Sequence, residues 1–123
     1  MARISNLIPA DIMRWVNTTK WSIDGLAMAW KEEKSLRQWV FVNIVSWVAI
    51  VVLGFHAEQA ALLIALGVLV VIVELLNSAI ETCIDYVSTD RHPLAKKAKD
   101  IASAAVFVSA LLWGGLWVLI LFA

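Results

Sequence analysis

Residues typical of disulfide, zinc and phosphate-loop sites are scarce in this sequence. Among 123 residues there are one cysteine, two histidines and five glycines. The lone Cys83 excludes an intrachain disulfide, and its place beside Glu81 indicates a helix-filling side chain rather than a redox group. The sequence contains no Walker loop, no Gly-x-Gly-x-x-Gly motif, no zinc-spaced Cys/His cluster and no nucleophile elbow. These absences argue against the familiar soluble nucleotide-binding, zinc and serine-hydrolase sites.

Charge is also scarce and is confined to short blocks. Only 16% of the residues are charged and 62% are hydrophobic, and the mean hydropathy is +0.83. This composition predicts an all-α membrane protein with a single domain over residues 1–123. We expect an N-terminal amphipathic surface helix over about 9–30 and three membrane spans over about 36–55, 58–87 and 98–123.

The basic residues are distributed unevenly along the chain. Six precede the first predicted span, four lie between the second and third spans, and the loop at 54–59 has none. The ten residues are Arg3, Arg14, Lys20, Lys31, Lys34, Arg37, Arg91, Lys96, Lys97 and Lys99. Under the positive-inside rule, this asymmetry predicts a multi-pass protein whose N-terminus and second loop are cytoplasmic.

Polar side chains form one stripe along the otherwise apolar second span. At about 100° per residue, Glu74, Asn77, Glu81 and Asp85 fall at roughly 0°, 300°, 340° and 20° around the helix. A charged side chain deep in a bilayer costs at least about 2.5 kcal/mol on insertion scales. Such a side chain usually faces a bundle interior, a cavity or a ligand, so the stripe is the primary candidate site.

The acids and lysines near the membrane surface suit phosphoryl transfer. Glu33 and Glu81, with Asp85 as a further candidate, offer the hard oxygen ligands that Mg²⁺ prefers. A lysine in the 96–99 cluster can hold phosphate oxygens, and Glu74 is placed to accept a proton from a hydroxyl at lipid depth. Each residue also has an alternative, purely structural explanation. For Asn77 it is a hydrogen bond to another helix, and for Glu81 it is a position at the solvated end of its helix.

Three groups of residues occur in order along most of the chain. These are Gly25-Leu26, Ala29-Trp30, Glu33 and Leu36-Arg37-Gln38; Glu74-x-x-Asn77-Ser78-Ala79-Ile80-Glu81 with Asp85; and Ala98-Lys99-Asp100-x-x-Ser103-Ala104-Ala105-Val106. In these groups the sequence resembles a known family, the small integral-membrane diacylglycerol kinases of bacteria with their undecaprenol kinase relatives.

The resemblance implies a homotrimer in the bacterial cytoplasmic (inner) membrane, with active sites shared between neighbouring subunits. It implies Mg²⁺ as cofactor and ATP as co-substrate. The catalytic base falls on Glu74, with Asn77 beside it, and the metal ligands fall on Glu33 and Glu81. The nucleotide contacts fall on Arg14, Trp21, Glu33, Glu81, His92, Lys99 and Asp100. The lipid-side contacts fall on Ser35, Leu36, Arg37, Gln38, Trp39 and Ser103.

Three positions depart from the family pattern. Trp39 stands where members commonly have an acid, Trp21 stands where a tyrosine is usual, and His92 directly precedes Pro93. These departures concern the lipid side and the nucleotide loop, and none of them touches Glu74, Asn77 or Glu81.

The function predicted from these residues is an ATP-dependent lipid kinase that converts diacylglycerol to phosphatidic acid at the inner leaflet. The partners are then a lipid alcohol and membrane lipids, with no nucleic acid. Undecaprenol kinase is the alternative within the family. A small membrane transporter or proton relay using Glu74 is the alternative of another class, but it leaves Glu33 and the cluster at 96–100 unexplained.

Overall fold

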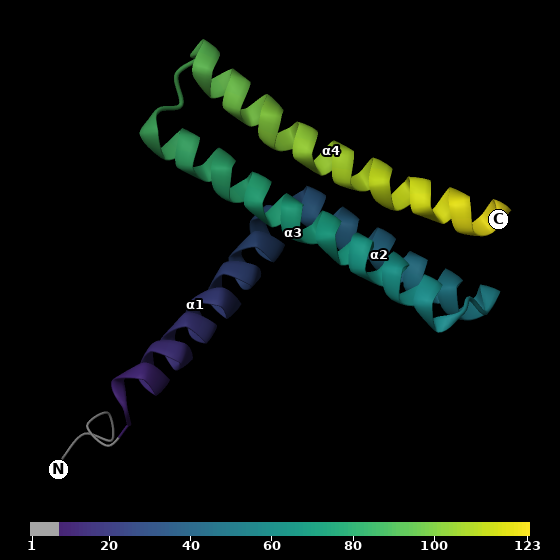
Figure 1. Cartoon of the computed structure of the whole chain (residues 1–123). Coiled ribbons are helices and arrows are strands. Elements are labelled where there is room, and N and C mark those ends of the chain that lie inside the picture. The colour runs from purple at the N-terminus through teal and green to yellow at the C-terminus, as the bar shows by residue number, and fades with distance from the viewer. Residues whose placement is uncertain (1–7) are drawn as a thin grey trace. The chain divides into compact units, whose positions relative to one another are not determined.

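The computed structural model of the chain describes residues 8–123, and all regular structure in this range is helical (Figure 1). The helices are α1 (Ala10–Glu32), α2 (Lys34–Leu53), α3 (Ala57–Val87) and α4 (Pro93–Phe122). Helices α2, α3 and α4 are each long and apolar enough to cross a membrane. The predicted all-α architecture with three membrane-spanning helices is therefore confirmed. Arg3, one of the basic residues used to predict the topology, lies outside the described residues.

Helix α1 belongs to a unit of its own, separate from the unit formed by residues 33–123. Asp11 lies in its first turn and Lys31 in its last, and each charge opposes the helix dipole at that end. The hydroxyls of Thr18 and Thr19 donate to the backbone carbonyls four residues earlier, both at 2.9 Å. Because these hydroxyls bond within the helix, the polar stretch at 17–19 continues it without a break.

The second unit begins at Glu33, whose extended backbone (φ −103°, ψ 103°) separates α1 from α2. The Glu33 side chain makes no capping hydrogen bond to α2. Its carboxylate oxygens are therefore not used to satisfy the backbone N–H groups at the start of this helix.

The connection between α2 and α3 is a tight turn around Gly54. Gly54 has a left-handed backbone (φ 67°), and its N–H donates to the Ile50 carbonyl at 3.2 Å. Glycine adopts this conformation without the steric cost that a Cβ would add, which explains its place at the end of α2. On the other side of the turn, the backbone N–H of His56 donates to Gln59 Oε1 at 3.2 Å and caps α3.

Helix α3 contacts both α2 and α4, and it runs antiparallel beside α4 (Figure 1). The core between the helices consists of Ile50, Leu63, Val70 and Trp113. At 1.5 Å per residue the 31 residues of α3 span about 46 Å, which exceeds the ~30 Å hydrocarbon core of a bilayer. One helix therefore carries side chains from lipid depth to the membrane surface.

Buried polar groups add specific contacts to this apolar packing. Asn43 in α2 is 2% exposed, and its Nδ2 donates to the carbonyls of Trp39 at 2.9 Å and Gly67 at 3.0 Å. Trp117 Nε1 in α4 donates to Ser46 Oγ in α2 at 3.1 Å. These hydrogen bonds join α2 to α3 and to α4, and no local pattern in the sequence indicates them.

Gly67→Ala is expected to destabilise the bundle. A Cβ at Gly67 would lie 2.4 Å from Asn43 Oδ1 and 2.7 Å from Trp113 Cζ2, so the rigid indole ring or the helix would have to move. Overpacking of this kind typically costs about 1–3 kcal/mol. The measurement is the thermal unfolding midpoint of the purified protein in detergent micelles, which should fall.

Gly115→Ala is the matched control, because among residues 8–123 a Cβ there meets no atom within 4 Å beyond its chain neighbours and the adjacent backbone of its own helix. The added methyl group also favours the helix by up to about 1 kcal/mol. Equal unfolding midpoints for the two variants would contradict the close packing at Gly67.

Candidate active site

The carboxylate of Glu74 is buried between α2 and α3. Glu74 is 4% exposed and follows a long apolar stretch of α3. The hydroxyl of Ser35, in the first turn of α2, donates a hydrogen bond to Glu74 Oε1. The structure therefore brings together two predicted site residues that are 39 positions apart in the chain.

The polar stripe of α3 becomes more exposed toward the end of the helix. Glu74 is buried, Asn77 and Glu81 are half-buried, and Asp85 is exposed. Asn77 Oδ1 is itself buried and has no hydrogen-bond partner among residues 8–123. The stripe thus offers a shielded carboxylate at one end and a solvated one at the other, with a half-buried carboxylate and an unused amide oxygen between them.

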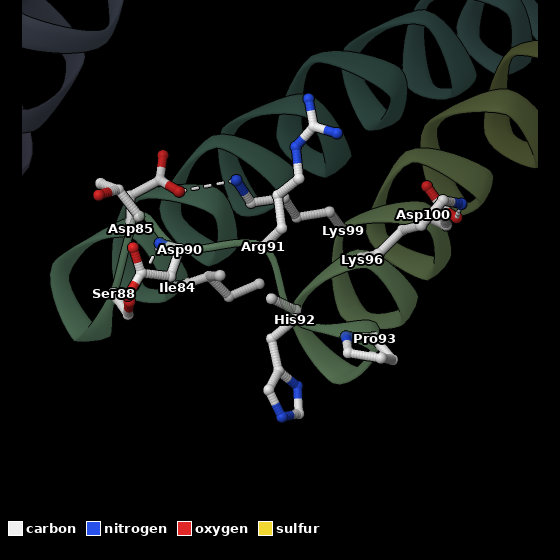
Figure 2. A pocket seen from close by; sticks show the side chains of 12 residues that line it. Ile84, Asp85, Ser88, Asp90, Arg91, His92, Pro93, Lys96, Lys99 and Asp100 are labelled. Atoms are coloured by element: carbon white, nitrogen blue, oxygen red, sulfur yellow. Dashed lines mark hydrogen bonds and ion pairs between the residues drawn. The ribbon is translucent and has the colours of Figure 1, made fainter.

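A cavity of about 640 Å³ lies at the turn that connects α3 to α4 (Figure 2). Its lining includes Asp85 from α3, Arg91 and His92 from the turn, and Lys99 and Asp100 from α4. Pro93 begins α4, where its missing N–H costs no hydrogen bond. Three of the predicted nucleotide contacts, His92, Lys99 and Asp100, therefore line one cavity.

Ion pairs orient the lysines of this cavity. Lys99 Nζ donates to Asp85 Oδ1 at 2.7 Å, as Figure 2 shows, and the charge of Glu81 also attracts this ammonium. Lys96 pairs with Asp100 one turn along α4. An ammonium has three donors, so Lys99 keeps donors for a further anion while it is bound to Asp85.

His92 has a structural role at the start of α4. Its Nδ1 accepts the N–H of Leu94 at 3.1 Å and caps the helix. In Figure 2 its ring points away from the Asp85–Lys99 pair. The cap occupies Nδ1, so only Nε2 of the ring is left for a nucleotide.

The predicted lipid-side residues differ in exposure. Leu36 is 3% exposed and packs inside the unit. Arg37 and Trp39 are half-buried, and Trp39 packs against the hydrophobic core. Gln38 and Ser103 are exposed. Exposed side chains on α2 and α4 are available to a ligand or a neighbouring molecule, whereas Leu36 supports the position of α2.

Arg14 and Trp21, the other predicted nucleotide contacts, lie on α1. Both are exposed, and the Arg14 guanidinium lies over the Trp15 ring at 5.9 Å from its centre. Because α1 belongs to a separate unit, their role in nucleotide binding stays a prediction.

Two carboxylates, those of Glu33 and Glu81, are the predicted metal ligands of the site. Residues 8–123 contain no group of three or more His, Cys, Asp or Glu side chains able to hold a metal ion. Magnesium usually takes one or two carboxylates, while substrate phosphates and water complete its shell. Two carboxylates have the oxygen ligands that such a magnesium ion would need. They are Glu33, whose side chain makes no capping hydrogen bond, and the half-buried Glu81.

Two features of the site were missed in the sequence. Arg91 lines the cavity beside Lys99, and only its membership in the basic cluster of the second loop could have indicated this. Ser35 was predicted to contact lipid, which stays a prediction, and its hydroxyl also donates to the Glu74 carboxylate. No local pattern could indicate that contact, because it depends on how α2 and α3 pack.

Comparison with known proteins identifies the family. The model of the prokaryotic diacylglycerol kinase family matches residues 20–121. The chain belongs to this family. The resemblance found in the sequence is thereby confirmed, and so is the assignment as a kinase, which implies the use of ATP.

Curated relatives agree with the family assignment. The diacylglycerol kinase of Pseudomonas aeruginosa is 43% identical over 110 residues, which cover 89% of each chain. That of Helicobacter pylori is 43% identical over 97 residues, covering 79% of this chain and 76% of the relative. That of Escherichia coli K12 is 34% identical over 110 residues, covering 89% and 90%. The similarity therefore extends over at least three quarters of each protein.

Lys99→Gln is expected to weaken nucleotide binding by this kinase. Removing a charged donor to phosphate should raise the KM for MgATP about tenfold or more, since hydrogen bonds to charged groups contribute about 1.5–3 kcal/mol. The Lys99 and Asp85 side chains are 39% and 52% exposed, so solvent screens their ion pair and the unfolding midpoint should change little. The measurements are steady-state kinetics against ATP and thermal unfolding.

Lys97→Gln is the matched control, since Lys97 lies on the same helix but outside the cavity lining. An equal rise in KM for both variants would show a general charge effect, and would count against a nucleotide contact at Lys99.

Proposed function

We propose that this protein transfers the γ-phosphoryl group of ATP to the free hydroxyl of diacylglycerol at the inner leaflet, giving phosphatidic acid. The observation that carries the proposal is the buried Glu74 carboxylate, which already accepts a hydrogen bond from an alcohol. Family membership and the names of the relatives support the lipid substrate.

In this proposal Glu74 is the general base. Its burial excludes bulk water, so an alcohol presented from the lipid is the proton donor that can reach it. Deprotonation of that alcohol as it attacks phosphorus increases its nucleophilicity, and the proton is transferred to the Glu74 carboxylate. Asn77, whose Oδ1 has no partner in the described chain, is placed one turn away to orient the reacting groups.

The nucleotide is assigned to the cavity at the turn between α3 and α4. Lys99 would hold phosphate oxygens, with Asp100 and His92 at the rim, and Arg14 and Trp21 would contribute from α1. Glu33 and Glu81 would hold Mg²⁺ together with the phosphates. When bound, Mg²⁺ supplies positive charge that neutralises the phosphates of the transferred group.

The assembly is proposed to be a homotrimer in the bacterial inner membrane with active sites shared between subunits. The N-terminus would be cytoplasmic, and α1 would lie as an amphipathic helix on the inner leaflet. The uneven distribution of basic residues supports this orientation. Asn77 Oδ1, buried without a partner among residues 8–123, supports a contribution from another copy or from a ligand.

Glu74→Gln is expected to abolish phosphatidic acid formation, because an amide cannot accept the proton of the attacking alcohol. The loss should be at least about a hundredfold in kcat, since general base catalysis typically contributes 10²–10⁴-fold. The measurement uses mixed micelles with MgATP and diacylglycerol, and undecaprenol is tested in parallel as the acceptor.

An unfolding midpoint equal to that of the unmodified protein would show that Glu74→Gln keeps the fold. Normal turnover in this variant would remove Glu74 as the base. Faster phosphorylation of undecaprenol than of diacylglycerol by the unmodified protein would change the assigned acceptor and leave the chemistry intact.

Glu81→Gln is expected to increase the Mg²⁺ concentration that gives half-maximal activity by about tenfold, because an amide oxygen is a weaker ligand than a carboxylate. The measurement is a magnesium titration of kinase activity at fixed ATP. Glu58→Gln, an exposed acid in the first turn of α3, is the control. An unchanged magnesium requirement in Glu81→Gln would remove Glu81 from the metal site.

A further inference from the structure

The hydrogen bond from Ser35 to Glu74 gives the buried carboxylate a fixed partner across two helices. The Lys99–Asp85 and Lys96–Asp100 ion pairs lie elsewhere and involve exposed side chains. The donor to Glu74 Oε1 is instead a neutral hydroxyl at the start of the neighbouring helix. Because the carboxylate is buried, its orientation depends strongly on this donor.

Ser35 is free to make this bond because of its place in α2. It is the second residue of the helix, which begins at Lys34 after the extended Glu33. No carbonyl of α2 lies a full turn before it, so its hydroxyl cannot bond back along the helix. By contrast, the Ser109 hydroxyl in the interior of α4 donates to the Val106 carbonyl of the same helix at 2.8 Å.

The neighbouring residue holds Ser35 in place. Leu36 is 3% exposed and anchors the first turn of α2 by packing inside the unit. Rotation of this turn would expose Leu36 and would move the Ser35 hydroxyl away from Glu74. Packing of Leu36 therefore fixes the direction in which the Ser35 hydroxyl points. A residue that orients another side chain needs such a fixed direction.

The bond also determines which oxygen of Glu74 is available for chemistry. A serine hydroxyl has a single proton to donate, and here that proton goes to Oε1. While this bond persists, Ser35 cannot donate to a lipid substrate. The second carboxylate oxygen, Oε2, is left to accept the proton of an acceptor alcohol.

We propose that Ser35 is a positioning residue that holds Glu74 Oε1 and thereby aims Oε2 at the hydroxyl of the lipid substrate. The inference rests on the proposed role of Glu74 as the base. It gives Ser35 a function distinct from the lipid contact that the family resemblance implied.

The test is steady-state kinetics of the full-length protein in mixed micelles with MgATP and diacylglycerol. Ser35→Ala should lower kcat about ten- to a hundredfold, because loss of a hydrogen bond to a charged group or a small displacement of the base has effects of this size. The KM values for diacylglycerol and for MgATP should stay within about twofold. Ser35→Thr keeps the hydroxyl and should restore most of kcat.

Two further variants separate positioning from a general structural effect. Ser109→Ala removes a buried serine hydroxyl outside the site and should leave kcat unchanged. Glu74→Asp shortens the base so that it cannot meet Ser35 in the same way. Adding Ser35→Ala to Glu74→Asp should therefore lower kcat by less than about twofold.

Three outcomes would overturn the role of Ser35. These are an unchanged kcat in Ser35→Ala, a raised KM for diacylglycerol with kcat unchanged, and an equal loss of kcat when Ser35→Ala is added to Glu74→Asp. Failure of the proposed function is distinguishable, because it would appear in the unmodified protein as absent phosphatidic acid, or in Glu74→Gln as normal turnover.

Discussion

Burial of the Glu74 carboxylate is the constraint on which the rest of the structure depends. An ionisable group within an apolar span is costly unless a specific partner or a function offsets the cost. Here the partner is the Ser35 hydroxyl, which requires the first turn of α2 to meet the middle of α3. The extended backbone at Glu33 makes this possible, because it lets α2 begin just before Ser35 and leaves the hydroxyl unused by the helix.

A second set of polar contacts fixes the helices farther along the spans. In lipid the hydrophobic effect contributes little to the association of two apolar helices, because the lipid tails are themselves apolar. Close packing and hydrogen bonds therefore determine how the helices align along their lengths. Gly67 leaves space for Asn43 and Trp113, and the Asn43 amide donates to the Gly67 carbonyl. Together with the Ser35–Glu74 bond, this contact joins α2 to α3 at two levels, which resists both sliding and rotation.

The sequence predicted the helices well because long uncharged runs and helical spacing are local properties. It also identified the stripe of α3, since polar residues at one angle on an apolar helix stand out. It did not reveal the Ser35–Glu74 bond, the Lys99–Asp85 pair or the Asn43–Gly67 contact. Each depends on the rotation of two helices about their axes, and the hydrophobic pattern of a membrane span constrains that rotation weakly because nearly every face is apolar.

Helix α3 joins two different environments along its length. Glu74 is shielded, so the proton transfer proposed for it would meet no competition from water, whereas Asp85 is exposed and shares the cavity with Lys99. Phosphate binding at Lys99 need not break its ion pair with Asp85, because an ammonium has three donors and Asp85 Oδ1 occupies one. The pair therefore presents an oriented cation in the cavity, and the rigid helix sets its separation from Glu74, the proposed base.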